Sequence, residues 1–428
     1  MSLVKPFRAR MYRHEPGQDV SALAAPPYDV IDAQMRQMLL EGHPHNVVAL
    51  ELPDGPLDPD APDNRYETGR ATWREWHHQG ILVDDETPAV YVLEQSWEHR
   101  GRPMRRRAFV AAVRLHPFTD GVVLPHERTL PKALSDRFEL VRATAANLSP
   151  VFSLFSDPEC ATDAEFDAAM REVPLLTATD AAGVLSRLWA IRDPAAIARV
   201  TGITGTGPLF IADGHHRYTT ALAYRDERRA ADAEAGRHPA DPAYDFVMMA
   251  LVNMDDPDLH VLATHRLART DNRLDVPAFW TAMERIFDCT DTRETEPPLT
   301  GRPSFVVRTA DGTTRLAALR ADVDPVEVIP GDRAAAWKTL DVTVLQELVL
   351  EPLLGIRQDD PRSLERLAFS KDAAEALRLP GGAEVAFVLA PTRLEQLRAV
   401  ALAGEVMPQK TTYFYPKVLS GLLFHALD

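Results

Sequence analysis

The segment Asp213-Gly214-His215-His216-Arg217 places a carboxylate, two histidines and an arginine side by side. The apolar run PLFIA before it predicts a buried strand, and the Ala- and Arg-rich stretch after it predicts a helix. The first turn of a helix leaves backbone N–H groups unpaired and carries a partial positive charge. Gly214 allows a sharp turn and the close approach of a ligand. We therefore predict a strand–loop–helix unit in which the histidines and Arg217 bind a phosphate or carboxylate.

Two roles stay open for Asp213, which ends the predicted strand. Its carboxylate suits a general base or a metal ligand, and it equally suits the N-cap of the following helix. In the second case the two histidines would be ordinary surface groups. A run of polar and glycine residues at the carboxyl end of a buried strand is typical of ligand sites, and it favours the functional interpretation.

Two loops earlier in the chain are rich in reactive side chains. In APPYDVI the paired prolines form a rigid, extended stretch that directs Tyr28 and Asp29 either into a pocket or into a structural turn. The second loop, LPHERTLPK, carries an acid–base pair, a hydroxyl and a cation: His126, Glu127, Thr129 and Lys132. Such a density of polar groups in a loop favours a binding or catalytic site.

The segment MPQKTTYFYPK near the end of the chain mixes cations, hydroxyls and aromatic rings. Its candidate ligand-binding residues are Lys410, Thr412, Tyr413 and Lys417. A wall of a ligand pocket and a strand edge sealed by aromatics are both open interpretations. We further expect this segment and the His126–Thr129 loop to face the same pocket as the Asp213–Arg217 loop. Glu51, after VVAL, adds a carboxylate at the end of an expected strand.

Long stretches of the chain resemble the bacterial and archaeal family catalogued as domain of unknown function (DUF) 1015. The resemblance spans nearly the whole sequence and rests on the motifs APPYDVI, PHERTLPK, LVRATAANLSPVF, IADGHHRYTTAL and AGEVMPQKTTYFYPK. It implies membership of the family and assigns no activity.

The strand–DGHHR–helix unit is also similar to the signature loop of the ParB/sulfiredoxin-like superfamily. That loop reads Gly-Cys-His-Arg in sulfiredoxins, and in free serine kinases it is similar to Asp-Gly-His-His-Arg. The resemblance implies that Gly214 and Arg217 occupy phosphate-cradling positions and that His216 is the shared histidine. His215 stands where sulfiredoxins have their catalytic cysteine, which excludes thiol-based reductase chemistry. The kinase pattern is intact.

The expected elements predict an α+β fold with mixed sheets, the strand–DGHHR–helix unit and a C-terminal α/β region. At 428 residues the chain exceeds one ordinary domain. Candidate regions are 1–155 with the pocket loops, 156–270 with the ParB/sulfiredoxin-like core, and 271–428 ending in MPQKTTYFYPK. We expect a strand at Val47–Pro53 and an amphipathic helix at Leu340–Leu354.

Composition limits the partners. The formal net charge of -16 repels phosphodiester backbones, so nucleic acid is not an expected partner. The basic run Arg102–Arg107 is interpreted as a hairpin turn between two strands. No apolar run is long enough to cross a membrane, and the two cysteines are far apart, which together predict a cytoplasmic protein. The oligomeric state is not indicated.

The residues and the resemblance together predict a phosphate-handling enzyme, a small-molecule phosphotransferase similar to free serine kinases. ATP or ADP would donate the phosphoryl group, Asp213 or Glu127 would activate the acceptor hydroxyl, and Mg²⁺ would screen the phosphate charge. No Walker-type phosphate loop is present in the sequence. The alternative within the enzyme class is a phosphatase that acts on a metabolite such as phosphoserine and binds the phosphate through the same Asp213–Arg217 loop. A non-enzymatic sensor of a nucleotide or phosphorylated metabolite is the alternative from another class.

Overall fold

The computed structural model describes residues 2–127, 131–299 and 301–428, without the side chains of residues 131–133. The chain folds into two compact units. The first comprises Met1–Pro125, Thr129–Leu259 and Pro416–Asp428, and the second comprises His126–Arg128 and His260–Tyr415. The chain therefore returns to the first unit for its last residues.

A ten-stranded sheet is the centre of the first unit, in the order β3-β10-β11-β5-β6-β13-β9-β12-β7 with β1 beside β6. In that order the strands are Gln18–Asp19, Leu176–Thr179, Leu185–Ile191, Val90–His99, Arg102–Arg114, Phe246–Asn253, Val151–Phe155, Leu209–Asp213 and Val123–Leu124, and β1 is Val4–Lys5. Every residue of β13 is buried, as its continuous apolar sequence predicts. This one sheet contains strands from both of the expected regions 1–155 and 156–270.

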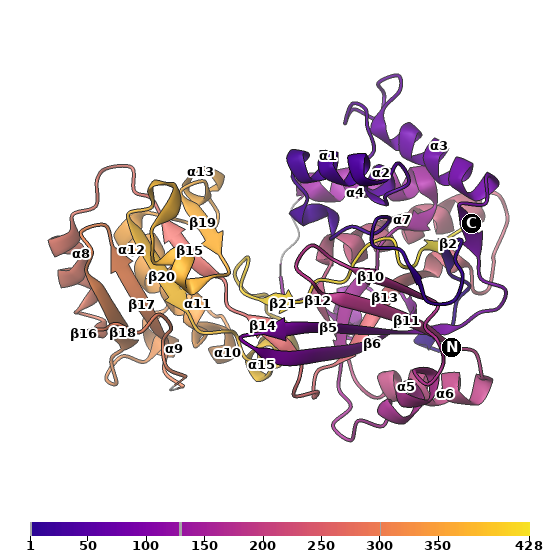
Figure 1. Cartoon of the computed structure of the whole chain (residues 1–428). Coiled ribbons are helices and arrows are strands. Elements are labelled where there is room, and N and C mark those ends of the chain that lie inside the picture. Colours follow the sequence, from indigo (N-terminus) through magenta and orange to yellow (C-terminus); the bar gives the residue numbers. More distant parts are fainter. Residues whose placement is uncertain (1, 128–130, 300) are drawn as a thin grey trace. The chain divides into compact units, whose positions relative to one another are not determined.

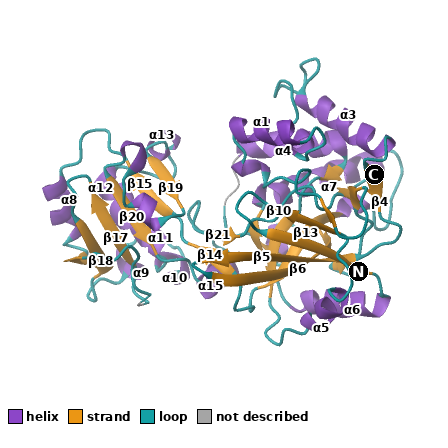
Figure 2. Ribbon diagram, in the orientation of Figure 1, coloured by secondary structure: helices purple, strands orange, loops and turns teal. Residues whose placement is uncertain are grey.

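Helices cover the sheet of the first unit on both sides (Figures 1 and 2). On one side lie α1 (Ala33–Gly42), α2 (Val48–Glu51), α3 (Arg65–His78) and α4 (Pro131–Thr144), and on the other α5 (Asp163–Ala169) and α6 (Pro194–Ile203). The long helix α7 (His215–Glu234) contributes to the same core cluster as α5 and α6. Helix α7 buries Tyr218 and Ala221 in a core cluster with Met249 and Leu251 of β13. Two short pairs complete the unit: β2 (Arg10–Tyr12) with β4 (Leu82–Asp84), and β8 (Ala146–Asn147) with β22 (His425–Ala426).

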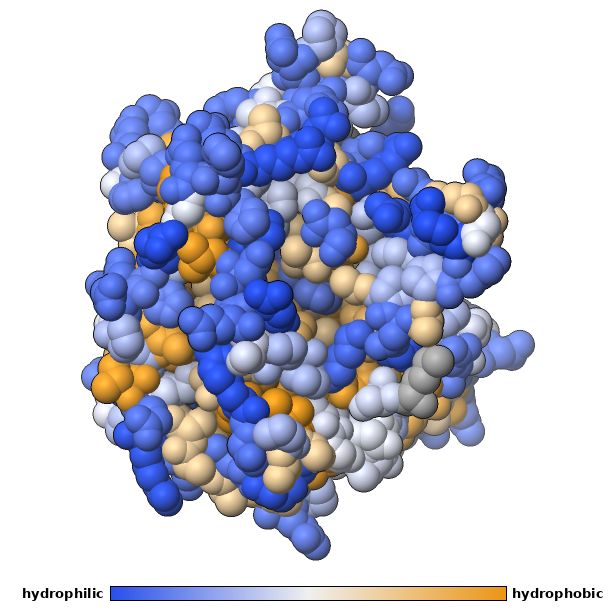
Figure 3. All heavy atoms as spheres, turned by 90° about the vertical axis from the view of Figure 1, so that its right-hand side faces the viewer, coloured by the Kyte–Doolittle hydropathy of each residue, from blue (hydrophilic) through white to orange (hydrophobic). Residues whose placement is uncertain are grey.

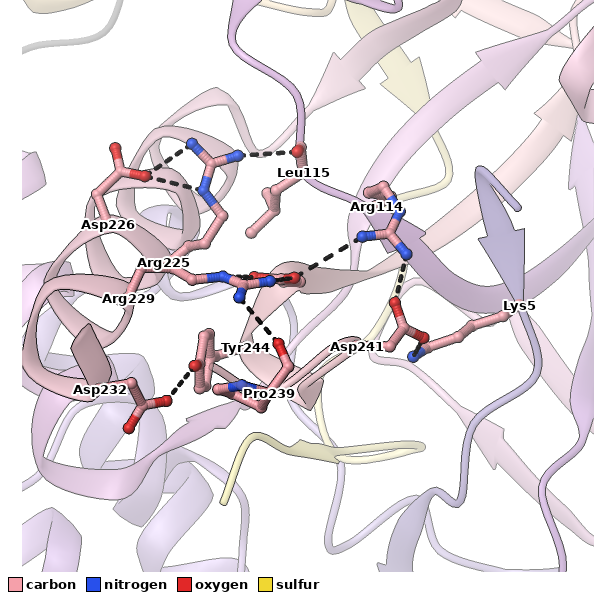
Figure 4. Close-up of polar contacts among 11 residues, drawn as sticks. Lys5, Arg114, Leu115, Arg225, Asp226, Arg229, Asp232, Pro239, Asp241 and Tyr244 are labelled. Carbon is pink, nitrogen blue, oxygen red and sulfur yellow. Dashed lines mark hydrogen bonds and ion pairs between the residues drawn. The ribbon is translucent and has the colours of Figure 1, made fainter. Parts of the chain in front are cut away.

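An ion-pair network fastens the C-terminal half of α7 to the sheet (Figure 4). Asp245 is buried, and its carboxylate pairs with Arg229 of α7 and lies 3.7 Å from Arg114 of β6. Arg114 also pairs with Asp241, which Lys5 of β1 contacts at 2.8 Å. The candidate loop lies at the N-terminal end of α7, and these ion pairs fix the C-terminal half of the same helix to the sheet.

Two local predictions are wrong. Val47–Pro53 is not a strand: the helix α2 occupies Val48–Glu51. The turn predicted at Arg102–Arg107 lies earlier, because His99 pairs with Arg102 and leaves Arg100 and Gly101 as the two loop residues, both with positive φ. Positive φ at both loop residues is the geometry that matches strand twist in tight hairpins. The basic run therefore lies inside β6.

The second unit holds a six-stranded sheet in the order β16-β18-β17-β20-β15-β19 and the pair β14–β21. The strands are Phe287–Asp291, Thr314–Leu319, Ser304–Thr309, Val385–Leu389, His265–Ala268 and Leu367–Ser370, with β14 at His260–Leu262 and β21 at Tyr413–Tyr415. The helices are α8 (Val276–Met283), α9 (Pro325–Val328), α10 (Ala335–Lys338), α11 (Asp341–Leu345), a π-helix at Gln346–Leu350, α12 (Glu351–Leu354), α13 (Pro361–Leu364), α14 (Ala373–Ala376) and α15 (Leu394–Leu402). The helix expected at Leu340–Leu354 is present, with the π-helix in its middle. Both units mix sheets and helices, which confirms the predicted α+β class.

The face of the molecule seen in Figure 3 is mostly hydrophilic, with apolar residues in small separate areas. Exposed apolar residues that are scattered singly are ordinary on the surface of folded proteins. No helix in the described part of the chain combines the length and apolar character needed to cross a bilayer.

Candidate functional site

The candidate loop sits at the carboxyl end of β12. Asp213 is the last residue of the strand, Gly214 is the N-cap of α7 with φ 86° and ψ 31°, and α7 begins at His215. The carboxylate Oδ1 of Asp213 accepts a 3.0 Å hydrogen bond from the adjacent Gly214 N–H and caps no later residue of the helix. The N-cap alternative for Asp213 is therefore wrong, because Gly214 takes that position in a left-handed conformation open to glycine.

Asp213 is instead the anion of a small cationic cluster. Lys417 Nζ lies 2.9 Å from Asp213 Oδ2, and Arg217 Nη2 lies 3.7 Å from the same oxygen. Arg217 also donates through Nη1 to the carbonyl of Pro150. All three charged side chains are at most one-fifth exposed. The structure thus brings together the predicted loop and the last residue of the predicted C-terminal segment.

The β5–β6 hairpin positions Lys417 through the main chain of residues 416–417. Arg106 of β6 donates to the Pro416 carbonyl at 2.6 Å, and Gln95 of β5 donates to the Lys417 carbonyl at 2.9 Å. Gln95 and Arg106 are cross-strand partners and also bond to each other. The segment that carries Lys417 is thereby held against the sheet.

Arg106 is a member of the cluster that sequence reasoning missed. Its side chain is buried, its guanidinium lies 4.6 Å from the Phe152 ring centroid, and Nε and Nη1 have no hydrogen-bond partner among the described residues. Burial lowers the pKa of Arg106 to about 9, an effect that the Asp213 charge opposes. The sequence signal that could have indicated the burial of Arg106 is the alternation of side chains along a strand. Arg106 shares a face of β6 with Ala108 and Val110, which are buried.

The cationic neighbours hold Asp213 ionised. Burial by itself would raise the pKa of this carboxyl, but the charges of Lys417 and Arg217 outweigh burial and hold the pKa well below its usual value. Ionisation at neutral pH agrees with the expectation from the sequence. A carboxylate with so low a pKa is a weak general base, since an effective base has a pKa near the working pH.

A small cavity of ≈ 40 Å³ adjoins Arg217. Its polar lining includes Tyr28, Glu51, Arg137 and Thr220. Glu51 is buried, lies 3.4 Å from Arg137 Nη1 and accepts a 3.2 Å hydrogen bond from Ser420 Oγ. The Arg137 guanidinium lies 4.2 Å from the Tyr28 ring centroid, and burial raises the pKa of Tyr28 to about 12. Asp29, in contrast, is exposed.

The other candidates lie in the second unit, where two segments pair. Thr412 Oγ1 lies 2.9 Å from the Nε2 nitrogen of His126, and Glu127 Oε1 accepts a 3.2 Å hydrogen bond from the Lys410 N–H. Tyr413 begins β21, and Lys371 Nζ lies 3.6 Å from its ring centroid. Thr129 and the side chain of Lys132 are outside the described residues.

The candidates therefore form two groups, one in each unit. Tyr28, Asp213, Gly214, Arg217 and Lys417 belong to the first unit, together with His215, which is buried, and His216, which is half-buried. His126, Glu127, Lys410, Thr412 and Tyr413 belong to the second. That all of them face one pocket stays a prediction.

The described residues contain no group of three or more His, Cys, Asp or Glu side chains that could hold a metal ion. Near Asp213 the neighbouring charges are cations, and both carboxylate oxygens already accept hydrogen bonds. A cationic environment of this kind does not fit a resident divalent cation.

The sequence defines the family of the chain. Residues 4–343 match the family described as "Protein of unknown function (DUF1015)", and the chain belongs to that family. No curated protein matches the chain.

Among solved structures, the chain is similar to a conserved hypothetical protein from Pyrococcus furiosus (16% identity, 69% of this chain and 89% of that one, TM-score 0.32). It is also similar to a free serine kinase in complex with AMP (15%, 68% and 83%, TM-score 0.31) and to SbnI from Staphylococcus aureus (12%, 73% and 86%, TM-score 0.36). Likeness at this level assigns no activity.

Proposed function

We propose that the chain is a phosphate-handling enzyme, a small-molecule phosphotransferase that holds the transferring phosphoryl group at the start of α7. One observation carries the proposal. Three buried guanidinium nitrogens, Arg106 Nε and Nη1 and Arg217 Nε, lack a hydrogen-bond partner within the described residues, and both arginines interact electrostatically with Asp213 at a helix N-terminus. Buried donors without an acceptor are unfavourable, and phosphate oxygens would supply acceptors of the right charge.

Each group in the cluster has a distinct part in this proposal. Arg217 and Arg106 donate to phosphoryl oxygens, and the first N–H groups of α7 add the partial positive charge of a helix start. Lys417 supplies a compact positive charge next to them. Asp213 acts as a positioning residue, because it fixes the ammonium of Lys417 and the guanidinium of Arg217 in one geometry. Such fixed charges stabilise the transition state of phosphoryl transfer.

The cavity beside Arg217 is the proposed place for the acceptor hydroxyl. In the reaction, the P–O bond to the leaving nucleotide breaks, a P–O bond to the acceptor oxygen forms, and the hydroxyl proton passes to a carboxylate. Glu51 is the carboxylate that lines this cavity with Arg217, so it is our choice for the proton acceptor. The role of Glu127 as base, expected from the sequence, stays a prediction.

The proposed donor is ATP or ADP. Magnesium would enter with the nucleotide as part of the substrate, since Mg²⁺ commonly binds through phosphates and only one or two carboxylates. The proposed location remains the cytoplasm, where these nucleotides and small hydroxy compounds are available.

The test is turnover by the full-length chain. The protein is incubated with MgATP or MgADP and serine or a related hydroxy compound, and ³¹P NMR follows a new phosphomonoester. Product that appears only with both substrates supports the proposal. Phosphate released from phosphoserine without nucleotide would show the phosphatase, and a nucleotide-dependent rise in melting temperature without any product would show a sensor. Glu51→Gln should lower turnover, whereas Glu67→Gln, an exposed carboxylate of α3, should not.

Gly214→Ala should weaken phosphate binding about tenfold or more. A Cβ at this position would lie 2.8 Å from Arg217 Nε and 2.9 Å from Nη2, so the guanidinium must move. Gly183→Ala is the matched control, because Gly183 has nearly the same φ (81° against 86°) and a Cβ there meets nothing within 4 Å. Both variants carry the backbone strain of a left-handed alanine, about 1 kcal/mol. Calorimetry with ATP measures how tightly each variant binds the phosphate groups of the nucleotide. Equal affinity for ATP in the two variants would contradict the role of Arg217.

A further inference from the structure

We propose that a cavity in the second unit is a separate binding site for a small carboxylate with a planar, apolar body. The cavity measures ≈ 190 Å³ and is lined by residues of the second unit only. For comparison, an engineered cavity of about 150 Å³ in another protein binds benzene. A ligand with one ring and a short acidic side chain therefore fits the volume.

Arg266 supplies the charge that would bind the carboxylate. Its side chain is buried, and it donates to the carbonyls of Thr264, Gln409 at 3.2 Å and Lys410 at 3.0 Å. These bonds use three of its five N–H groups. Among the described residues, no carboxylate forms an ion pair with Arg266; Glu127 only acts on it at longer range. A buried cation without an ion partner is costly, and an acidic ligand would neutralise it.

Aromatic rings supply the walls for a planar body. Trp337 is nearly fully buried, and its indole N–H is held by the Val406 carbonyl at 3.0 Å, which fixes the plane of the ring. Phe369 lies beside Arg266, with 5.4 Å from its ring centroid to the guanidinium. Aliphatic residues add apolar surface to the lining: Val342, Leu350, Leu364, Leu367 and Val406.

The acidic groups near the cavity do not compete for Arg266. Asp359 pairs with Arg357 at 2.8 Å, and Glu405 pairs with Arg333, whose guanidinium stacks 4.6 Å from the Trp337 ring centroid.

The cavity also borders the π-helix through Gln346 and Leu350. Single π-helical turns inside α-helices are frequent at functional sites.

The motif MPQKTTYFYPK is divided between the two sites. Met407, Pro408 and Gln409 line the cavity, whereas Lys417 pairs with Asp213 in the first unit. A ligand wall was one of the two interpretations of this motif. The first half would serve the carboxylate site and the last residue would serve the phosphate site.

The experiment compares two probes on the full-length chain: 3-phenylpropionate and its neutral analogue 3-phenylpropan-1-ol. We expect 3-phenylpropionate to bind with a dissociation constant on the order of 1 mM, which is ordinary for a ligand of about eleven non-hydrogen atoms. The alcohol should bind at least tenfold more weakly. Ligand-observed NMR measures both. Equal binding of the two probes, or no binding of the carboxylate, would overturn the proposal.

Two variants locate the binding. Leu364→Trp places a larger side chain at the half-buried rim of the cavity and should abolish binding of 3-phenylpropionate. Leu402→Trp makes the same change at an exposed position of α15 and should leave binding unchanged. Arg266→Gln should remove the preference for the carboxylate; if that variant does not fold, the probe comparison and the tryptophan pair still decide. Binding that survives Leu364→Trp would place the ligand elsewhere and contradict the proposal.

Discussion

Asp213→Asn is expected to lower phosphoryl-transfer turnover by on the order of a hundredfold, the usual effect of losing one preorganised charge, without weakening phosphate binding. Asparagine keeps the size of the side chain but removes the charge that holds Lys417 at 2.9 Å and Arg217 at 3.7 Å. The two cations then repel each other and leave their positions. The site becomes more positive, so its affinity for phosphate is kept or increased. Loss of kcat with an unchanged or lower dissociation constant distinguishes positioning from simple binding.

The matched control is Asp226→Asn, which breaks an exposed pair with Arg225 on the same helix and should leave kcat unchanged. A second measurement uses pH. Because the pKa of folded Asp213 lies below the ordinary value of 3.8, the ionised carboxylate stabilises the fold above that pH, and this contribution is lost as the pH falls below it. The parent should therefore lose stability in acid more steeply than Asp213→Asn. An Asn variant with the parent's turnover would remove Asp213 from the mechanism.

Asp245→Asn is expected to destabilise the first unit by about 2 kcal/mol. Breaking a fully buried ion pair costs about 3–5 kcal/mol. Asp245 is 4% exposed, but its partner Arg229 is 40% exposed, so solvent compensates part of the loss. The corresponding fall in melting temperature is about 4–8 °C, measurable by calorimetry.

Asp226→Asn again serves as the comparison, because it also removes a carboxylate from an arginine pair but at 67% exposure. Its expected effect is below about 0.5 kcal/mol. If the two variants have the same melting temperature, the ion-pair network of Figure 4 stabilises the fold no more than an exposed surface pair does. In that case the packing of its apolar face alone holds α7 in place.

The strand–loop–helix unit could be predicted because each of its signals is local. An apolar run, a glycine and a long Ala-rich segment follow one another, and β12, Gly214 and α7 occupy those positions. The helix α2 could not be predicted in this way. Asn46 sets its start, since its side chain accepts from Val48 N–H and donates to the carbonyls of Ala22 and Ala24. That tertiary contact overrides the strand preference of VVAL.

Arg106 was missed for a different reason. A charged residue in a basic run is expected at the surface, and this expectation outweighed the strand alternation that places Arg106 on the same face as Ala108 and Val110. Its partners outside the β5–β6 hairpin, moreover, are distant in the sequence. Its guanidinium bonds to Pro416, which lies 310 positions away, and Lys417 meets Asp213 across 204 positions. The residue types of the cluster were readable from the sequence, whereas the pairing of Lys417 with Asp213 required the fold.

The return of the chain to the first unit has a consequence for biosynthesis. Residues Pro416–Asp428 are made after the whole of the second unit. A nascent chain that already contains the DGHHR loop still lacks Lys417, so Asp213 has only the arginines as cationic neighbours until the second unit has been made. Domains generally fold in the order in which the ribosome delivers them, but here the first unit can complete its charged cluster only after the second has been synthesised.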